Sequence, residues 1–258
     1  MYFEVFKGII LPFIGTTLGS ACVFFIKKSL KKGLKEAISG LAAGVMIAAS
    51  VWSLLIPAME YEVSQNLGAF SFLPATIGLW LGVLFLLLMD KVIPEPNIAS
   101  GDISGITKNK MLFLSVSLHN LPEGMAVGVV YAALVSSGNL DNLSGAFALS
   151  LGIAIQNFPE GAIVSMPLAN DGIKKWRAFL YGVLSGIIEP IGAALTLLAI
   201  AFVLPILPCL LGFAAGAMIY AVLKELSPII TNDEKSNIGI LFFSAGFSIM
   251  MILDVALG

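Results

Sequence analysis

The stretch LSGAFALSLGIAIQNFPEGAIVSMPL, from Leu143 to Leu168, decides what kind of protein this is. It is longer than the roughly 20 apolar residues that a helix needs to cross the hydrocarbon core of a bilayer. One carboxylate, Glu160, nevertheless lies near its middle, where an ionised side chain costs about 2.5–3.5 kcal/mol on insertion scales. The stretch therefore predicts a membrane-spanning helix whose intramembrane acid is kept for a function.

The rest of the chain is similarly apolar. Hydrophobic residues make up 58% of the 258 residues and charged residues only 12%, against about 25% charged residues in a soluble domain, and the mean hydropathy is +0.98. No basic run is interleaved with aromatic residues, so nucleic-acid binding is not expected. The pattern predicts an all-α integral membrane protein with one polytopic domain and eight transmembrane helices. The predicted spans are residues 8–26, 37–59, 72–89, 111–135, 143–168, 177–203, 207–226 and 238–257.

The basic residues predict the orientation in the membrane. Of the 14 Lys and Arg residues, all but Lys7 fall in or beside the connections that follow the first, third, fifth and seventh spans. Because cytoplasmic loops carry the excess of positive charge, both termini are expected outside the cytoplasm. The longest connection, residues 91–110, combines prolines, glycines and polar residues, and we expect it to be a mobile cytoplasmic loop.

The chain also resembles itself. Three pairs of segments match in the same order: GLAAGVMI (40–47) with GFAAGAMI (212–219), PFIG at Pro12 with PIG at Pro190, and Asp90 with Asp254. Spans one to three are thus predicted to repeat as spans six to eight around a central pair, spans four and five. The odd offset inverts one copy, as is characteristic of secondary transporters with a binding site near the membrane midplane. Small-residue helices can match by chance, but the shared order favours a true repeat.

Two related polar motifs lie in the central pair of spans. They are HNLPEG at residues 119–124 and QNFPEG at residues 156–161. Residues three or four apart share a helix face, so the polar side chains of each motif gather on one face: His119, Asn120 and Glu123 in the first, and Gln156, Asn157 and Glu160 in the second. Pro122 and Pro159 cannot donate a backbone hydrogen bond, so each is expected to bend its helix and free a carbonyl oxygen.

A third intramembrane carboxylate, Glu189, lies next to Pro190 in the sixth span. Imidazole, amide oxygens and three carboxylates that converge in a bundle would suit a divalent ion such as Zn²⁺, Fe²⁺ or Cd²⁺. The spans contain no basic residue that would neutralise these acids, which favours a cation as the counter-charge. Taken singly, each signal has a plainer interpretation: a histidine in the core, a proline kink, or a protonated glutamate. The duplicated motif favours the metal site.

At these residues the sequence resembles the ZIP (Zrt-, Irt-like protein) family of divalent metal transporters, and within it the bacterial GufA-like branch. The resemblance covers nearly the whole chain, and two x-Asn-x-Pro-Glu-Gly strings in order are highly specific. It implies a binuclear site in which His119, Gln156 and Glu189 hold one metal, Asn120 and Asn157 the other, and Glu123 and Glu160 bridge them. It also implies pathway roles for Met46, Ser53, Glu60, Glu225 and Asp254. Many relatives have histidine in place of Gln156, which leaves the preferred metal open.

The resemblance further implies zinc uptake into the cytoplasm by alternating access, in which the repeat-bearing and metal-carrying helices shift against each other. The expected location is a bacterial cytoplasmic (inner) membrane. Cd²⁺, Fe²⁺ and Mn²⁺ are also candidate cargoes, since mixed nitrogen and oxygen ligands accept several ions. No prosthetic group is expected, and the small residues on the helix faces would allow a homodimer.

Two alternatives stay open at this point. In the first, a proton- or sodium-coupled carrier of another substrate uses the intramembrane carboxylates to bind the driving ion. In the second, the chain is an intramembrane metalloprotease. The sequence contains neither a His-Glu-x-x-His pair nor a Gly-x-Ser-x-Gly nucleophile, and it has one histidine, so it does not favour an enzyme.

Overall fold

The regular structure of the chain is helical throughout the part that the structure, a computed structural model, describes. That part comprises residues 2–25, 32–64, 70–92, 105–138, 143–170, 172–230 and 236–257. The elements are α1 (Tyr2–Phe25), α2 (Lys32–Ala49), the π-helical segment η1 (Ser50–Leu55), α3 (Ile56–Ser64), α4 (Phe72–Val92), α5 (Gly105–Ser137), α6 (Leu143–Asn170), α7 (Lys175–Gly186), α8 (Ile188–Leu198), α9 (Ile200–Val203), the 3₁₀ segment η4 (Leu204–Ile206), α10 (Leu207–Ala221), the π-helical segment η5 (Val222–Leu226), α11 (Ser227–Ile230) and α12 (Ile238–Leu257).

Seven helical stretches in the described part are long and apolar enough to cross a membrane, so the chain is a multi-pass membrane protein. They cover all the predicted spans except the fourth, residues 111–135, which lies inside the 33-residue helix α5. Large apolar side chains point outward along these helices, for example Trp80 in α4 and Leu241 in α12, as a lipid-facing surface requires. Of the predicted loop at 91–110, residues 93–104 lie outside the described residues, and residues 105–110 are helical.

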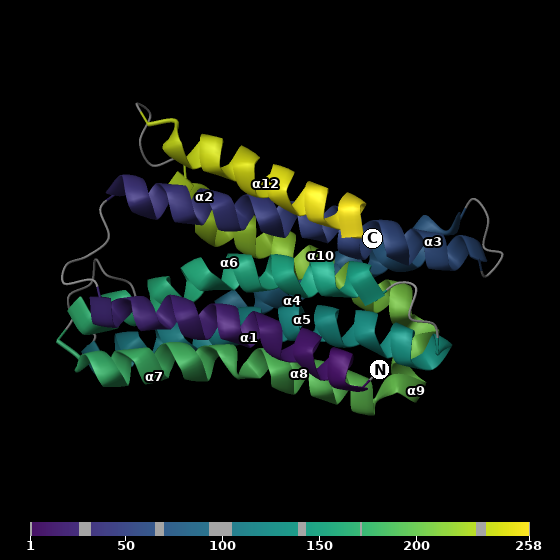
Figure 1. Ribbon diagram of the computed structural model, residues 1–258, viewed down its shortest axis with the longest axis horizontal. Helices are drawn as coiled ribbons and strands as arrows, with labels where there is room; N and C mark the ends of the chain where they lie inside the picture. The colour runs from purple at the N-terminus through teal and green to yellow at the C-terminus, as the bar shows by residue number, and fades with distance from the viewer. Residues whose placement is uncertain are drawn as a thin grey trace.

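The helices lie side by side along one long axis, and both termini are at the same end of the bundle (Figure 1). Helices α1, α5, α6, α7 and α8 pack against one another and form one group. In the other group, α2 packs along α12 and α10 packs along α4. Figure 1 shows α2 and α12 at one edge of the bundle and α7 and α8 at the other. Helices α5 and α6 contact α10 and α2, respectively, and so join the two groups.

The pairs α2–α12 and α4–α10 are packed in the same way. A Cβ atom on Gly40 of α2 would lie 2.2 Å from the carbonyl oxygen of Gly239 in α12. A Cβ atom on Gly212 of α10, which matches Gly40 in sequence, would lie 2.1 Å from the carbonyl oxygen of Ala75 in α4. The absence of side chains at these positions lets each helix pair approach closely.

A π-helical segment interrupts α2 and α10 at matching positions. Segment η1 begins at Ser50 and η5 begins at Val222, at the same distance along the chain from Gly40 and Gly212, respectively. Short π-helical turns inside α-helices occur frequently at functional sites. The contacts and the π-helical segments thus follow the internal match that the sequence contains.

Candidate metal site

The two polar motifs meet in the core between α5 and α6. Glu123 of α5 is 2% exposed and Gln156 of α6 is fully buried. The amide Nε2 of Gln156 donates a hydrogen bond of 2.9 Å to Oε1 of Glu123. Pro122 and Pro159 lie within α5 and α6, and neither proline ends its helix. His119 also belongs to α5, but its side chain lies outside the described residues.

The third carboxylate, Glu189, enters the same region from a broken helix. Helix α7 ends at Gly186 and α8 begins at Ile188, and Pro190 has no N–H to give to the carbonyl of Gly186. The Glu189 side chain is 1% exposed, and its Oε1 accepts a hydrogen bond of 2.8 Å from the hydroxyl of Thr16 in α1. Glu160 and Asn157 lie near the Glu189 side chain.

Asn120 ties α5 to the end of α7. Its side chain is fully buried, and its Nδ2 donates a hydrogen bond of 2.9 Å to the backbone carbonyl of Ser185. This hydrogen bond fixes the orientation of the Asn120 amide, so its Oδ1 points away from the Ser185 carbonyl. The structure therefore brings two helical motifs and one broken helix to a common polar region inside an apolar bundle.

Buried oxygen atoms without a donor mark this region. Within the part of the chain that the structure describes, four such oxygens on the predicted ligands have no hydrogen-bond partner: Asn120 Oδ1, Gln156 Oε1, Asn157 Oδ1 and Glu189 Oε2. Each buried oxygen left unpaired costs about 1–3 kcal/mol, so four together need compensation. A cation would supply it, because carboxylate and amide oxygens are ligands for divalent ions. Three of these four residues hold the oxygen in place by bonding their other polar atom to the protein.

The described side chains contain no group of three or more His, Cys, Asp or Glu residues placed to hold a metal ion. Half of the predicted ligands whose side chains are described are amides rather than acids: Asn120, Gln156 and Asn157 beside Glu123, Glu160 and Glu189. The described part of the donor set is therefore mainly oxygen.

The final glycine of each motif sets how closely the neighbouring helix approaches. A Cβ atom on Gly124 would lie 2.2 Å from the carbonyl oxygen of Glu189, and one on Gly161 would lie 2.1 Å from the carbonyl oxygen of Thr16. The glycines thus allow α8 and α1 to lie directly against the motifs. Neither glycine was predicted from the sequence to have a role.

The structure brings together two of the predicted pathway residues. The hydroxyl of Ser53, in η1, donates to Oδ1 and Oδ2 of Asp254 in α12, at 2.8 and 2.9 Å. Met46 is 2% exposed in α2, and Glu60 is exposed in α3. The side chain of Glu225 lies outside the described residues.

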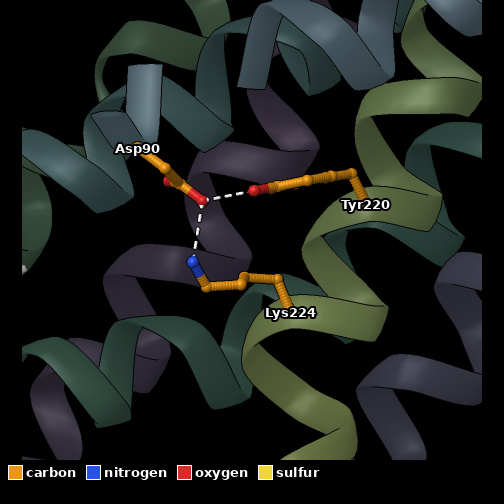
Figure 2. Close-up of polar contacts among 3 residues, drawn as sticks. All are labelled: Asp90, Tyr220 and Lys224. Carbon is orange, nitrogen blue, oxygen red and sulfur yellow. Dashed lines mark hydrogen bonds and ion pairs between the residues drawn. The ribbon is translucent and has the colours of Figure 1, made fainter. Parts of the chain in front are cut away.

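A polar cluster that the sequence analysis missed lies between α4 and α10. Figure 2 shows Asp90 at the end of α4, with Tyr220 and Lys224 converging on it from the neighbouring helix. The Tyr220 hydroxyl donates to Asp90 Oδ2 at 2.6 Å, and the Lys224 ammonium lies 3.1 Å from the same oxygen. Tyr220 and Lys224 are four residues apart and share a helix face, so their spacing was a usable signal. Asp90 itself was singled out only as the match of Asp254.

Comparisons with known proteins identify the relatives of this chain. Residues 100–254 match a family model described as ZIP Zinc transporter. Zinc transporter GufA of Myxococcus xanthus is 33% identical, over 95% of this chain and 96% of that protein. Zinc transporter ZIPB of Bordetella bronchiseptica is 34% identical, over 95% of this chain and 79% of that protein. Human zinc transporter ZIP11 is 31% identical, over 99% of this chain and 98% of that protein.

Proposed function

This chain belongs to the ZIP family of zinc transporters, and from that premise we propose that it takes zinc up into the cytoplasm through a binuclear site between α5, α6 and α8. It is a multi-pass membrane protein that transports divalent metal, and it is not an enzyme. The observation that carries the proposed site is the set of four buried, unpartnered oxygens on the predicted ligands. Zinc neutralises the carboxylates there and supplies the missing partner for those oxygens.

In the proposed site, Glu123 and Glu160 bridge two metal positions. His119, Gln156 and Glu189 bind one ion, and Asn120 and Asn157 bind the other. The hydrogen bond from Gln156 to Glu123 supports this assignment, since it engages the amide nitrogen and leaves the amide oxygen for the metal. The proximity of Glu160 and Asn157 to Glu189 supports the convergence of both motifs with α8.

The proposed membrane topology has eight spans, with α5 as the fourth, and both termini outside the cytoplasm of a bacterial inner membrane. The position of both termini at one end of the bundle (Figure 1) supports an even number of spans. The distribution of basic residues supports the orientation. The matched packing of α2–α12 and α10–α4 supports an inverted repeat, and dimer formation remains a prediction from the small-residue faces.

Transport is proposed to occur by alternating access, in which the two helix groups move relative to each other. The predicted ligands all lie on α5, α6 and α8, which belong to one packed group, while the paired helices α2–α12 and α4–α10 form the other. A movement between the groups would carry the site as a unit, without separating its ligands. Cd²⁺, Fe²⁺ and Mn²⁺ are additional proposed cargoes, since oxygen ligands accept them as well.

The test is zinc entry into sealed vesicles that contain the purified protein and an internal fluorescent zinc indicator. Wild type is compared with Glu160→Ala and with Glu4→Ala, which removes an exposed carboxylate paired with Lys7 near the N-terminus. Saturable entry that is lost in Glu160→Ala and kept in Glu4→Ala supports the proposal. Equal entry by both variants contradicts the site, and entry that follows only an imposed proton or sodium gradient favours the coupled-carrier alternative.

A further inference from the structure

Thr16 lies in the middle of α1, outside the set of predicted ligands, yet it contacts one of them directly. Its side chain is 1% exposed, and its Oγ1 lies 2.8 Å from Oε1 of Glu189, which is 173 residues away in the sequence. A hydroxyl buried among apolar helices needs a partner. Here the partner is a carboxylate that the proposed function uses for metal.

The geometry decides where the hydroxyl proton goes. A threonine hydroxyl has one proton, and two acceptors are in reach: the carbonyl of Pro12 at 3.5 Å and Oε1 of Glu189 at 2.8 Å. Threonine in a helix commonly bonds the carbonyl four residues earlier, but a distance of 3.5 Å makes that bond weak. The bond of 2.8 Å is the stronger one, so the proton is directed across the helix interface to Glu189.

Two glycines hold Thr16 at this distance. A Cβ atom on Gly161, in the second motif, would lie 2.1 Å from the Thr16 carbonyl oxygen, and one on Gly186 would lie 2.8 Å from the Thr16 Cβ and Cγ2 atoms. The backbone of α1 therefore lies directly against α6, and the Thr16 side chain lies directly against the end of α7, just before Glu189. The position of the hydroxyl is set by helix packing rather than by a flexible side chain.

The two oxygens of the Glu189 carboxylate consequently differ. Oε1 accepts the Thr16 hydroxyl, whereas Oε2 is buried and has no hydrogen-bond partner among the described residues. We propose that Thr16 is a positioning residue of the metal site: its hydroxyl holds Oε1 of Glu189 and thereby presents Oε2 to the metal. This inference rests on the proposed function. Hydrogen bonds of this kind orient metal ligands, and their removal typically weakens metal binding about 10- to 100-fold.

The glycine contacts give Thr16 and Glu189 equivalent places. Gly161 of the second motif lies on the backbone of Thr16, just as Gly124 of the first motif lies on the backbone of Glu189. At this place one copy of the repeat supplies a metal ligand, and the other copy supplies the hydroxyl that orients it. The two copies of the repeat thus contribute different groups to the site at equivalent positions.

The experiment compares zinc binding by Thr16→Val, Thr16→Ser and Thr17→Val, measured calorimetrically on the purified full-length protein in detergent. Valine keeps the shape of threonine without the hydroxyl, and serine restores the hydroxyl. The neighbouring Thr17 is the matched control, since its hydroxyl has no partner among the described residues. We expect Thr16→Val to weaken zinc binding about tenfold or more, Thr16→Ser to stay within about twofold of wild type, and Thr17→Val to bind like wild type.

Thermal unfolding without metal separates positioning from folding. A positioning role predicts that Thr16→Val melts like wild type without zinc but gains less stability when zinc is added. If Thr16→Val does not fold, the smaller Thr16→Ala is measured in its place. If the variants that lack the hydroxyl bind zinc with wild-type affinity while Glu189→Ala does not bind it, the role of Thr16 is overturned. The proposed metal site is then still supported. Wild-type affinity in Glu189→Ala and Glu123→Ala overturns the proposed site itself, and this inference with it.

Discussion

Replacing Gly124 by alanine tests how the site is assembled. The added Cβ atom would lie 2.2 Å from the carbonyl oxygen of Glu189, 2.7 Å from its Cα and 2.8 Å from its carbonyl carbon. All three are backbone atoms, so no side chain can rotate out of the way. Ordinary contact begins at 3.4 Å, and a close-packed interior offers no space to absorb the difference. Helices α5 and α8 must therefore separate by about 1 Å.

The separation is large compared with what a metal site tolerates. Ligand distances in a working site stay within about 0.2 Å of their ideal values, and Glu189 sits on the helix that would be displaced. We expect uptake at subsaturating zinc to fall about tenfold or more, as for other losses of ligand orientation. The overpacking itself is expected to cost about 1–3 kcal/mol of stability.

The assay is initial zinc entry into vesicles, normalised to folded protein, with Gly33→Ala as the matched control. Among the described residues, a Cβ atom on Gly33 meets only the Ile238 Cδ1 atom, at 3.4 Å, and alanine is favoured over glycine in a helix. We expect Gly33→Ala to transport like wild type. Wild-type uptake by Gly124→Ala would refute the argument that this glycine sets the approach of α8 to the site.

Four further substitutions probe the ligands and the cluster in Figure 2. Gln156→His places an imidazole at a proposed ligand and should raise the preference for Zn²⁺ over Mn²⁺, measured by competition during uptake. Asn120→Leu removes the amide that bonds the Ser185 carbonyl and offers Oδ1, so the calorimetric stoichiometry should fall from two zinc ions to one. Lys224→Met breaks a half-exposed ion pair and should cost less than about 1 kcal/mol, whereas Asp90→Asn, which weakens two contacts, should lower the melting temperature further.

The controls for these substitutions follow from the same contacts. Gln156→Leu cannot ligate, so unchanged metal preference in Gln156→His together with full uptake in Gln156→Leu would contradict the ligand role. A stoichiometry of two in Asn120→Leu would argue against a second metal position at Asn120. For the ion pair, Glu4→Gln disrupts the exposed Glu4–Lys7 pair and should leave the melting temperature unchanged.

The sequence predicted what depends on spacing along one helix. Apolar length predicted the seven stretches that are long and apolar enough to cross a membrane. The i, i+3 and i, i+4 positions placed Glu123 and Gln156 on polar helix faces, and a hydrogen bond joins these two side chains. The family resemblance named the transport function, which the relatives confirm. Each of these inferences uses information that lies within some 30 residues of chain, or in a motif, and needs no knowledge of how helices pack.

What the sequence did not predict depends on contacts between distant helices. Thr16 is an ordinary small residue in an apolar span until the packing of α1 brings it to Glu189. The matched segments aligned Pro12 with Pro190, whereas the glycine contacts place Thr16 opposite Glu189. Small residues recur along membrane helices because they allow close packing, so a match between them does not fix the register of a repeat. Only the packing fixes that register.

The paired π-helical segments have a consequence for the history of the chain. They begin at Ser50 and Val222, at matching places in the two proposed copies. A π-helical turn closes a wider hydrogen-bonded ring than the α-helix around it, so it is a local change in the geometry of the helix. If one three-helix segment was duplicated, a change found in both copies was present before the duplication. Common descent, rather than separate adaptation at the two membrane faces, then accounts for the pair, and the ancestral segment already carried this irregularity when it had to function in both orientations.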